Sequence, residues 1–371
     1  MTAERTEQTM LTRISRVQEN MNRDGADLLI ITPSSYLKYL TGLDMMQEER
    51  FFALILPAAS EPFFIANILY EEQLKPLHRI KCIYWKDGDD AFAVLKNELE
   101  KRGIARTHTC ADPFMRAGFL MMLIDSLQFG RLASAAPYID PLRVYKDEAE
   151  RASMREACRR ADRALENTMK HAETWPGRTE QEYLAALSYE LAVQGIRHGG
   201  GCICAGRNAA EPHHAADSTL ISQGAGLLVD FGGDFENYNT DMTRNFFFGK
   251  PDDEYLEIYK IVQEANQVGK EHVIHGSTLG SIDAAVRAVI EAYGYGKYFT
   301  HRTGHGIGID CHEGPSVQFG EKTPVSPGMC FSIEPGIYIP GKFGVRIEDQ
   351  ILVTENGYEV LHSFSRELQI I

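Results

Sequence analysis

Residues 227–248 read LLVDFGGDFENYNTDMTRNFFF. Two runs, 227–235 and 240–248, are rich in β-forming residues, and the turn-like residues 236–239 separate them. This stretch therefore predicts a β-hairpin. Each arm carries one carboxylate, Asp230 or Asp241, among apolar neighbours. A buried carboxylate needs a compensating partner, although either Asp taken alone is more typical of a turn.

The same order of elements is predicted twice around this hairpin. Before it come a helix with apolar residues at helical spacing from Met154 to Met169 and a helix that begins at the capping box Thr179/Glu182 and ends near Gly195. After it come predicted helices over 253–272 and 281–293 and strands over 330–339 and 345–354. Two helix–helix–strand halves predict a pseudo-symmetric α+β domain.

The first part of the chain has a different pattern. From Arg13 to Ile139 helix-like and strand-like segments alternate, and the apolar runs 28–31 and 51–56 are typical of buried strands. This predicts an α/β domain. Two prolines interrupt the segment 137–146 before a long charged helix. With 371 residues, two domains are expected, and we place them at 1–140 and 141–371.

Composition excludes several classes of protein. The formal net charge of -14 would repel a phosphate backbone, so we expect no nucleic-acid partner. No stretch approaches the roughly 20 apolar residues of a membrane span, and residues 1–13 lack a signal-peptide apolar region. We therefore expect no membrane partner and a cytoplasmic location. The seven cysteines form no Cys-x-x-Cys pair, which favours reduced thiols.

Three more polar residues lie in strand-like, apolar or glycine-rich sequence: His305, Glu334 and Glu348. Taken singly, Glu334 is also typical of a strand end, and Glu348 of an ion pair with Arg346. The glycines beside His305 leave room for a cation or a substrate. With Asp230 and Asp241, the set holds four carboxylates, whose charge two divalent cations would neutralise. Oxygen-rich ligation with one imidazole suits Mn, Co, Fe or Zn at a catalytic site.

The order and spacing of these five residues resemble the pita-bread metallopeptidase family that contains prolidase, aminopeptidase P and methionine aminopeptidase. The motifs that carry the resemblance are Val229–Gly233, Asn239–Arg244, His301–Gly308, Ser332–Gly336 and Val345–Asp349. Residues 27–30 and 39–42 also resemble the creatinase-type N-terminal domain of this family. Methionine aminopeptidase normally lacks that domain, which disfavours it.

The resemblance implies two divalent metal ions per subunit, with Mn the first expectation and Co, Zn or Fe as alternatives. By the family's pattern Asp230 binds one metal, Asp241 and Glu348 bridge both, and His305 with Glu334 holds the other. The family places a water or hydroxide between the metals, because paired cations lower its pKa. Glu334 is expected to take its proton.

Four further residues match family positions. His213 and His312 are expected to face the substrate, where an imidazole can donate to the developing oxyanion or pass a proton to the leaving nitrogen. His301 is expected on the proline side of the substrate, and Arg346 beside the bridging glutamate. Without the resemblance, His312 and the neighbouring His214 are typical surface residues, and Arg346 is equally a structural partner of Glu348 or Asp349.

The resemblance implies hydrolysis of the bond before proline in a peptide, most simply as an Xaa-Pro dipeptidase (prolidase). The alternative is an Xaa-Pro aminopeptidase, because some prolidases carry Arg after the His-Glu-x-Pro stretch to bind a free carboxylate and this chain has Ser316. A non-catalytic binding protein and a creatinase-like enzyme are more remote, since all five ligand positions are filled. Relatives with this N-terminal domain are commonly homodimers, and we expect one here.

Overall fold

The computed structural model describes residues 3–104 and 107–371, and side chains from residue 8 onward. The chain divides into two compact units, Met1–Leu142 and Arg143–Ile371. The predicted boundary between residues 140 and 141 falls inside helix α6 (Ala136–Val144), so as a domain boundary it stays a prediction. No helix within the described residues is long and apolar enough to cross a membrane.

Unit 1 is an α/β unit built on one mixed six-stranded sheet, in the order β4-β3-β2-β1-β5-β6. Its strands are β1 (Leu28–Ile31), β2 (Ala53–Pro57), β3 (Phe63–Asn67), β4 (Lys81–Trp85), β5 (His108–Ala111) and β6 (Arg131–Ser134). Its helices are α1 (Ala3–Asp24), α2 (Ser35–Thr41), α3 (Glu71–Leu74), α4 (Ala91–Lys101), α5 (Ala117–Ser126) and most of α6. The apolar run 28–31 forms a fully buried central strand, as predicted. Residues from α4 and α5 pack with β1, β2 and β3 in one apolar core.

Unit 2 holds three sheets and four long helices. The first sheet has the order β17-β9-β8-β7, the second β11-β10-β12-β15-β16, and β13 pairs with β14. The helices are α7 (Glu148–Thr168), α8 (Glu180–Val193), α9 (Asp253–Glu271) and α10 (Leu279–Ala292). The strands are β7 (Arg197–Ala205), β8 (Ala225–Phe235), β9 (Tyr238–Phe248), β10 (Gly304–Gly306), β11 (Glu313–Val317), β12 (Cys330–Ile333), β13 (Gly336–Ile339), β14 (Phe343–Arg346), β15 (Asp349–Thr354), β16 (Gly357–Val360) and β17 (Gln369–Ile370).

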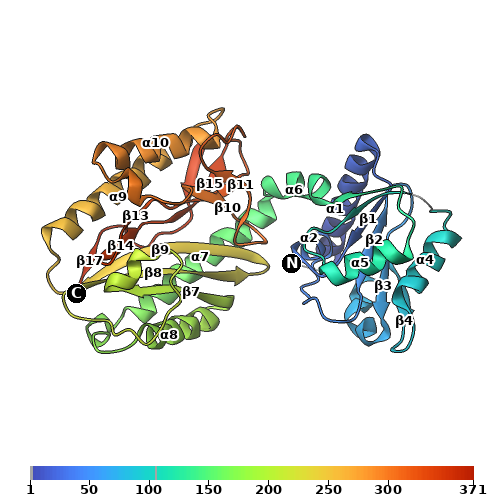
Figure 1. Ribbon diagram of the computed structural model, residues 1–371, viewed down its shortest axis with the longest axis horizontal. Helices are drawn as coiled ribbons and strands as arrows, with labels where there is room; N and C mark the ends of the chain where they lie inside the picture. Colours follow the sequence, from blue (N-terminus) through green and yellow to red (C-terminus); the bar gives the residue numbers. More distant parts are fainter. Residues whose placement is uncertain (1–2, 105–106) are drawn as a thin grey trace. The chain divides into compact units, whose positions relative to one another are not determined.

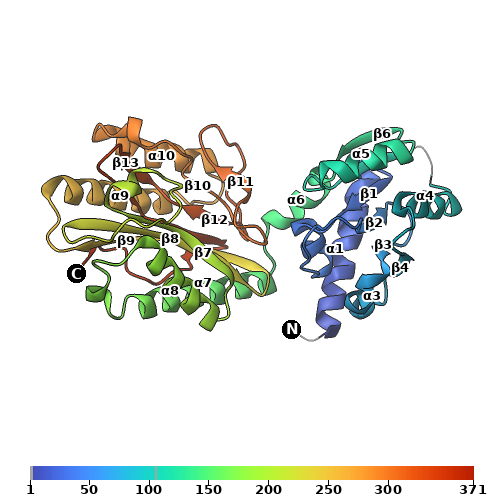
Figure 2. The same cartoon turned by 60° about the horizontal axis from the view of Figure 1, so that its bottom comes forward.

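Two helix pairs enclose these strands. Within unit 2, α7 and α8 lie on one side of the strands and α9 and α10 on the other (Figures 1 and 2). The first pair packs against the sheet that contains β8 and β9, and the second pair against β12 to β14. The capping box predicted at Thr179 and Glu182 does begin α8. Both predicted fold classes, α/β for the first part and α+β for the second, are confirmed.

The predicted hairpin is present, with a shorter turn than expected. Only Glu236 and Asn237 connect β8 and β9, with φ of 49° and 75°, and residues 238 and 239 belong to β9. Two residues with positive φ form the turn that suits the right-handed twist of a hairpin. The predicted strands 330–339 and 345–354 are each broken, at 334–335 and 347–348. Glu334 and Glu348 therefore lie at breaks between strands.

Candidate metal centre

One pocket in unit 2 is lined by every site residue that the sequence predicted. Two further residues, Pro212 and Arg302, complete the lining. The predicted residues that line it are His213, Asp230, Asp241, His301, His305, His312, Glu334, Arg346 and Glu348. The pocket therefore joins the hairpin, the His305 strand and the two strand breaks, which are far apart in the sequence.

The hairpin presents two carboxylates on neighbouring strands. Asp230 on β8 faces Thr243 on β9, and Asp241 lies two residues before Thr243. Because side chains alternate along a strand, Asp241 and Thr243 point to the same face. Glu348 joins them from the break before β15, where its Oε2 accepts a hydrogen bond of 2.8 Å from Thr243 Oγ1. Oxygen atoms of Asp230, Asp241 and Glu348 all lie within 4.8 Å of one another.

His305 and Glu334 form the other side of the group. The Nδ1 of His305 donates to the carbonyl of Gly306 at 3.1 Å, which leaves the Nε2 lone pair free. That Nε2 lies 3.3 Å from Glu334 Oε1 and 3.9 Å from Asp241 Oδ2. The hydroxyl of Ser332 accepts from the His305 backbone N–H at 3.0 Å and donates to Glu334 Oε1 at 3.2 Å. One serine thus holds both residues in place.

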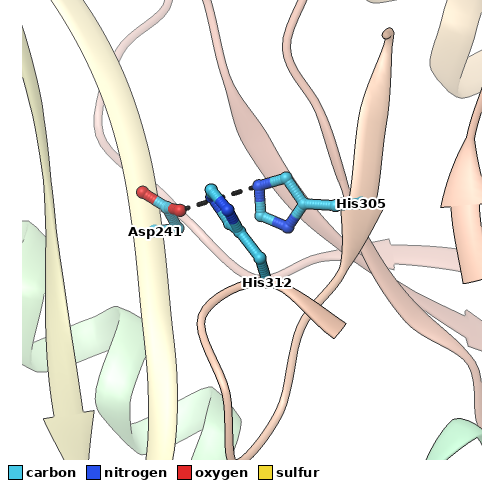
Figure 3. A group of neighbouring side chains, drawn as sticks. All are labelled: Asp241, His305 and His312. Atoms are coloured by element: carbon cyan, nitrogen blue, oxygen red, sulfur yellow. Dashed lines mark ion pairs between the residues drawn. The ribbon is translucent and has the colours of Figure 1, made fainter. Parts of the chain in front are cut away.

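His312 reaches the same group from the connection between β10 and β11. Figure 3 shows the side chains of Asp241, His305 and His312 converging. The ring centroids of the two histidines are 4.0 Å apart, and one ligand atom of each of the three residues lies within 4.8 Å of the others. The sequence predicted His312 as a group that faces the substrate, and this exposed residue lies at the edge of the ligand set.

The electrostatics of the group call for cations. Burial, and then the charge of Asp230, raises the pKa of Asp241 well above its usual value, and burial with the charge of Asp241 does the same to Glu348. Burial raises the pKa of Glu334 to about 7. Within the described chain, Glu348 Oε1 is buried without any hydrogen-bond partner. A carboxylate oxygen in that state is costly unless a cation meets it, so these residues fit divalent metal ions.

The imidazole of the group is neutral. Burial, and then the neighbouring His312, lowers the pKa of His305 to about 3. A neutral imidazole with a free Nε2 is the form that binds a metal.

Arg346 and His301 are joined in one hydrogen-bonded chain. Arg346 pairs with Asp230 at 2.6 Å and donates to Tyr338 Oη at 2.8 Å. Tyr338 Oη lies 2.8 Å from His301 Nε2, and His301 Nδ1 lies 2.7 Å from the carbonyl of Arg302. Both ring nitrogens of His301 are therefore bonded within the protein. Arg346, at the end of β14, forms its ion pair with Asp230 on the hairpin strand β8, and not with the neighbouring Glu348 or Asp349.

The loop that carries His213 is fixed by its neighbour. His214 Nε2 lies 2.8 Å from Glu180 Oε2, and the buried carboxylate of Glu180 also accepts from the backbone N–H of Ala205 at 2.6 Å. His214 does not line the pocket, whereas His213 does. Of the two adjacent histidines, one anchors the loop and the other faces the site.

The glycines around His305 have another role than the sequence suggested. A Cβ on Gly304 would lie 1.9 Å from the backbone oxygen of Ser332, and one on Gly306 would lie 2.6 Å from that of Gly314. These glycines therefore allow β10 to lie close to its two neighbouring strands. The sequence interpretation of room for a cation or substrate was wrong for these two glycines, because the space is filled by backbone.

Sequence reasoning missed several residues around the pocket. Tyr338 links Arg346 to His301, and the thiol of Cys311 donates to Asp241 Oδ2 at 3.0 Å. Arg302 lines the pocket and donates to Ser316 Oγ at 2.9 Å. Arg302 and Cys311 each adjoin a predicted histidine in the sequence, which was a usable signal. Tyr338 gave none, because its role depends on the β13–β14 pairing.

Comparisons with known proteins agree with this geometry. Residues 152–355 match metallopeptidase family M24, and residues 13–145 match the creatinase/prolidase N-terminal domain. A probable dipeptidase PepE of Mycobacterium tuberculosis is 35% identical over 92% of both chains. An Xaa-Pro dipeptidase of Lactobacillus helveticus is 32% identical over 96% of this chain and 98% of its own. The crystal structure of a prolidase from Thermococcus sibiricus superposes with a TM-score of 0.92 at 31% identity, covering 97% of this chain and 98% of the other. This chain belongs to metallopeptidase family M24.

Proposed function

We propose that this protein is an Xaa-Pro dipeptidase that requires divalent metal ions. The observation that carries the proposal is the buried pocket in which four carboxylates and a neutral imidazole converge, with an unpartnered oxygen on Glu348. The names of full-length relatives, an Xaa-Pro dipeptidase and a prolidase, support the substrate class.

The proposed ligands are Asp230, Asp241, His305, Glu334 and Glu348, holding two ions per subunit, with Mn ahead of Co, Zn and Fe. Four carboxylates balance the charge of two such ions. Bound there, the ions would supply Lewis acidity to a water and to the scissile carbonyl. Assembly as a homodimer stays a proposal from the family resemblance, and a cytoplasmic location stays a proposal from the sequence pattern.

The chain's own groups supply the proton transfers. Glu334 lies among the ligands and is proposed to accept the proton of the attacking water. His213 and His312 line the same pocket, and we assign them to donating a hydrogen bond to the carbonyl oxygen and a proton to the prolyl nitrogen as the C–N bond breaks. That nitrogen leaves only when it is protonated, because the unprotonated amide anion is too basic to be a leaving group. His301 is proposed to contact the substrate on the proline side, and Arg346 is proposed to bind the substrate beside Glu348.

Metal replacement with two substrates tests the proposal. Protein stripped with a chelator and then given Mn is expected to release proline from an Xaa-Pro dipeptide, and to do so faster than it removes the first residue of an Xaa-Pro-Xaa tripeptide. If folded protein supplied with Mn, Co or Zn cleaves neither peptide, the proposal is wrong. Ser316 favours the second candidate, an Xaa-Pro aminopeptidase, and faster cleavage of the tripeptide would establish it.

A further inference from the structure

Two arginines line the pocket, and they differ in what they bind. Arg346 is 3% exposed and is occupied by Asp230, Tyr338 and Thr243. Arg302 is partly buried, and its side chain donates one hydrogen bond, to the neutral hydroxyl of Ser316. It forms no ion pair with any residue that the structure describes. A guanidinium has five N–H donors in a planar fork, so most donors of Arg302 remain available.

The backbone that carries Arg302 is held on both sides. Arg287 on α10 donates to the carbonyl of His301 at 2.5 Å. Asp283, one turn earlier, accepts from the Thr303 N–H at 3.1 Å and from its hydroxyl at 2.8 Å. The carbonyl of Arg302 itself accepts from His301 Nδ1. The backbone at Arg302 is therefore fixed, which lowers the cost of ordering this segment when the side chain binds a ligand.

The position of this charge matches the chemistry of a dipeptide substrate. Hydrolysis of an Xaa-Pro dipeptide needs the metal centre at the scissile bond and leaves the free carboxylate of proline one residue away. Arg302 adjoins His301, the residue proposed for the proline side, and shares the pocket with the ligands Glu334 and His305. Arginine binds a carboxylate through two parallel hydrogen bonds, with geometry that a lysine or a hydroxyl cannot match.

We infer that Arg302 binds the free C-terminal carboxylate of the dipeptide and so determines the preference for dipeptides. The structure places the guanidinium of Arg302 against the hydroxyl of Ser316, at 2.9 Å. The positive charge is thus contributed from the residue after His301, and Ser316 orients it. This inference rests on the proposed dipeptidase activity.

The test compares an Xaa-Pro dipeptide with the same dipeptide as its C-terminal amide, which keeps the scissile bond and removes the negative charge. The ratio of kcat/KM for acid over amide is measured with Mn-loaded wild type, Arg302→Gln and Arg302→Lys. The matched control is Arg163→Gln, because Arg163 is exposed on α7 and does not line the pocket. Circular dichroism and thermal unfolding check that each variant is folded.

Arg302→Gln is expected to lower the acid-over-amide ratio by about 10- to 100-fold, the range for a charge-assisted hydrogen bond, mainly through a higher KM for the acid. The acid-over-amide ratio of Arg302→Lys is expected to lie between those of the wild type and Arg302→Gln, because lysine keeps the charge but lacks the planar fork of donors. Arg163→Gln is expected to keep the wild-type ratio. If Arg302→Gln does not fold, the lysine variant decides, with a ratio below that of the wild type expected.

Two outcomes separate failure of this inference from failure of the proposed function. If the wild type cleaves the acid, and folded Arg302 variants keep its acid-over-amide ratio, the role of Arg302 is wrong and the dipeptidase activity stands. An equal loss on acid and amide also overturns the role, because it means that Arg302 supports the pocket in general. If the wild type cleaves neither substrate when supplied with Mn, Co or Zn, the proposed function itself fails.

Discussion

The carboxylates of the pocket come from two regions that hold them by different means. Asp230 and Asp241 lie within two regular strands of 11 residues each, β8 and β9. Glu334 and Glu348 lie at two-residue breaks, between β12 and β13 and between β14 and β15. In the hairpin, the register of backbone hydrogen bonds sets the positions of the side chains. At the breaks that register is interrupted, so other groups must fix the backbone.

The groups that support each region can be named. The hairpin is held by close approach: β7 lies against β8 so tightly that a Cβ on Gly201 would lie 1.9 Å from the backbone oxygen of Asp230. The breaks are held by a side chain from α9. The amide of Asn266 donates to the carbonyls of Ile333 and Ile347, at 3.0 Å and 3.2 Å, and each of these residues directly precedes a ligand. One region therefore depends on backbone packing. The other depends on a buried amide, together with the backbone hydrogen bonds that Glu334 and Glu348 donate to Thr303 and Thr243.

The largest expected effect follows from removing a ligand of the hairpin. Asp241→Asn keeps the size of the side chain and removes its charge. We expect turnover of an Xaa-Pro dipeptide to fall by more than about 100-fold. Removing a group that only hydrogen-bonds to a metal ligand costs less, about 10- to 100-fold. We also expect that added Mn no longer raises the thermal unfolding temperature of the variant. Asp125→Asn, an exposed change on α5, is the control and should behave as wild type.

The same variant has an opposite effect on protein without metal. The charges of Asp230 and Glu334 disfavour the charge of Asp241, and the charge of Asp241 in turn disfavours that of Glu348. Neutralising it removes repulsion in a buried site. Chelator-treated Asp241→Asn should therefore unfold at the same temperature as chelator-treated wild type or a higher one. A large destabilisation without metal would show that Asp241 is a structural residue.

A smaller effect is expected from the backbone contact that supports the hairpin. Gly201→Ala forces β7 away from Asp230, and we expect a loss of unfolding free energy of about 3 kcal/mol, at the upper end for overpacking because the clash is with backbone. Gly200→Ala is the matched control, since a Cβ there meets nothing within 4 Å. Chemical unfolding measures both variants. Equal stability of the two would mean that close packing does not hold Asp230.

Much of this arrangement was predictable from the sequence. The hairpin, four helices and the ligand residues all leave local signals, namely β-forming runs, helical spacing and polar residues in apolar sequence. The break at Glu348 was not predicted, because no turn residue marks it in the sequence. At Glu334 a strand end was one of two interpretations, since Pro335 and Gly336 follow it. The turn was placed too long because positive φ at Glu236 is a tertiary outcome for a residue that rarely adopts it.

Arg302 shows the same limit for the site. Its sequence neighbours indicated a site, but the absence of an ion-pair partner among the described residues and the bond to Ser316 depend on how β10 and β11 pair. Pairing between strands is not written in either strand alone. The sequence therefore identified the residues that match a motif, but it did not identify Arg302, whose proposed role depends on a charge without an ion-pair partner among the described residues.

The smallest expected effect concerns the strand breaks. Asn266→Ala leaves the buried carbonyls of Ile333 and Ile347 without their donor, which should lower the unfolding free energy by about 1 to 2 kcal/mol. Because those carbonyls precede Glu334 and Glu348, Mn affinity should also fall by about 10-fold, as for other groups that orient metal ligands. Gln267→Ala, the next residue on α9, is exposed and bonds only within its helix, so it serves as the control. Calorimetric titration of Mn into stripped protein measures the affinity. If Asn266→Ala lowers stability and leaves Mn affinity unchanged, the breaks keep their ligands in place without α9, and backbone pairing is sufficient in both regions.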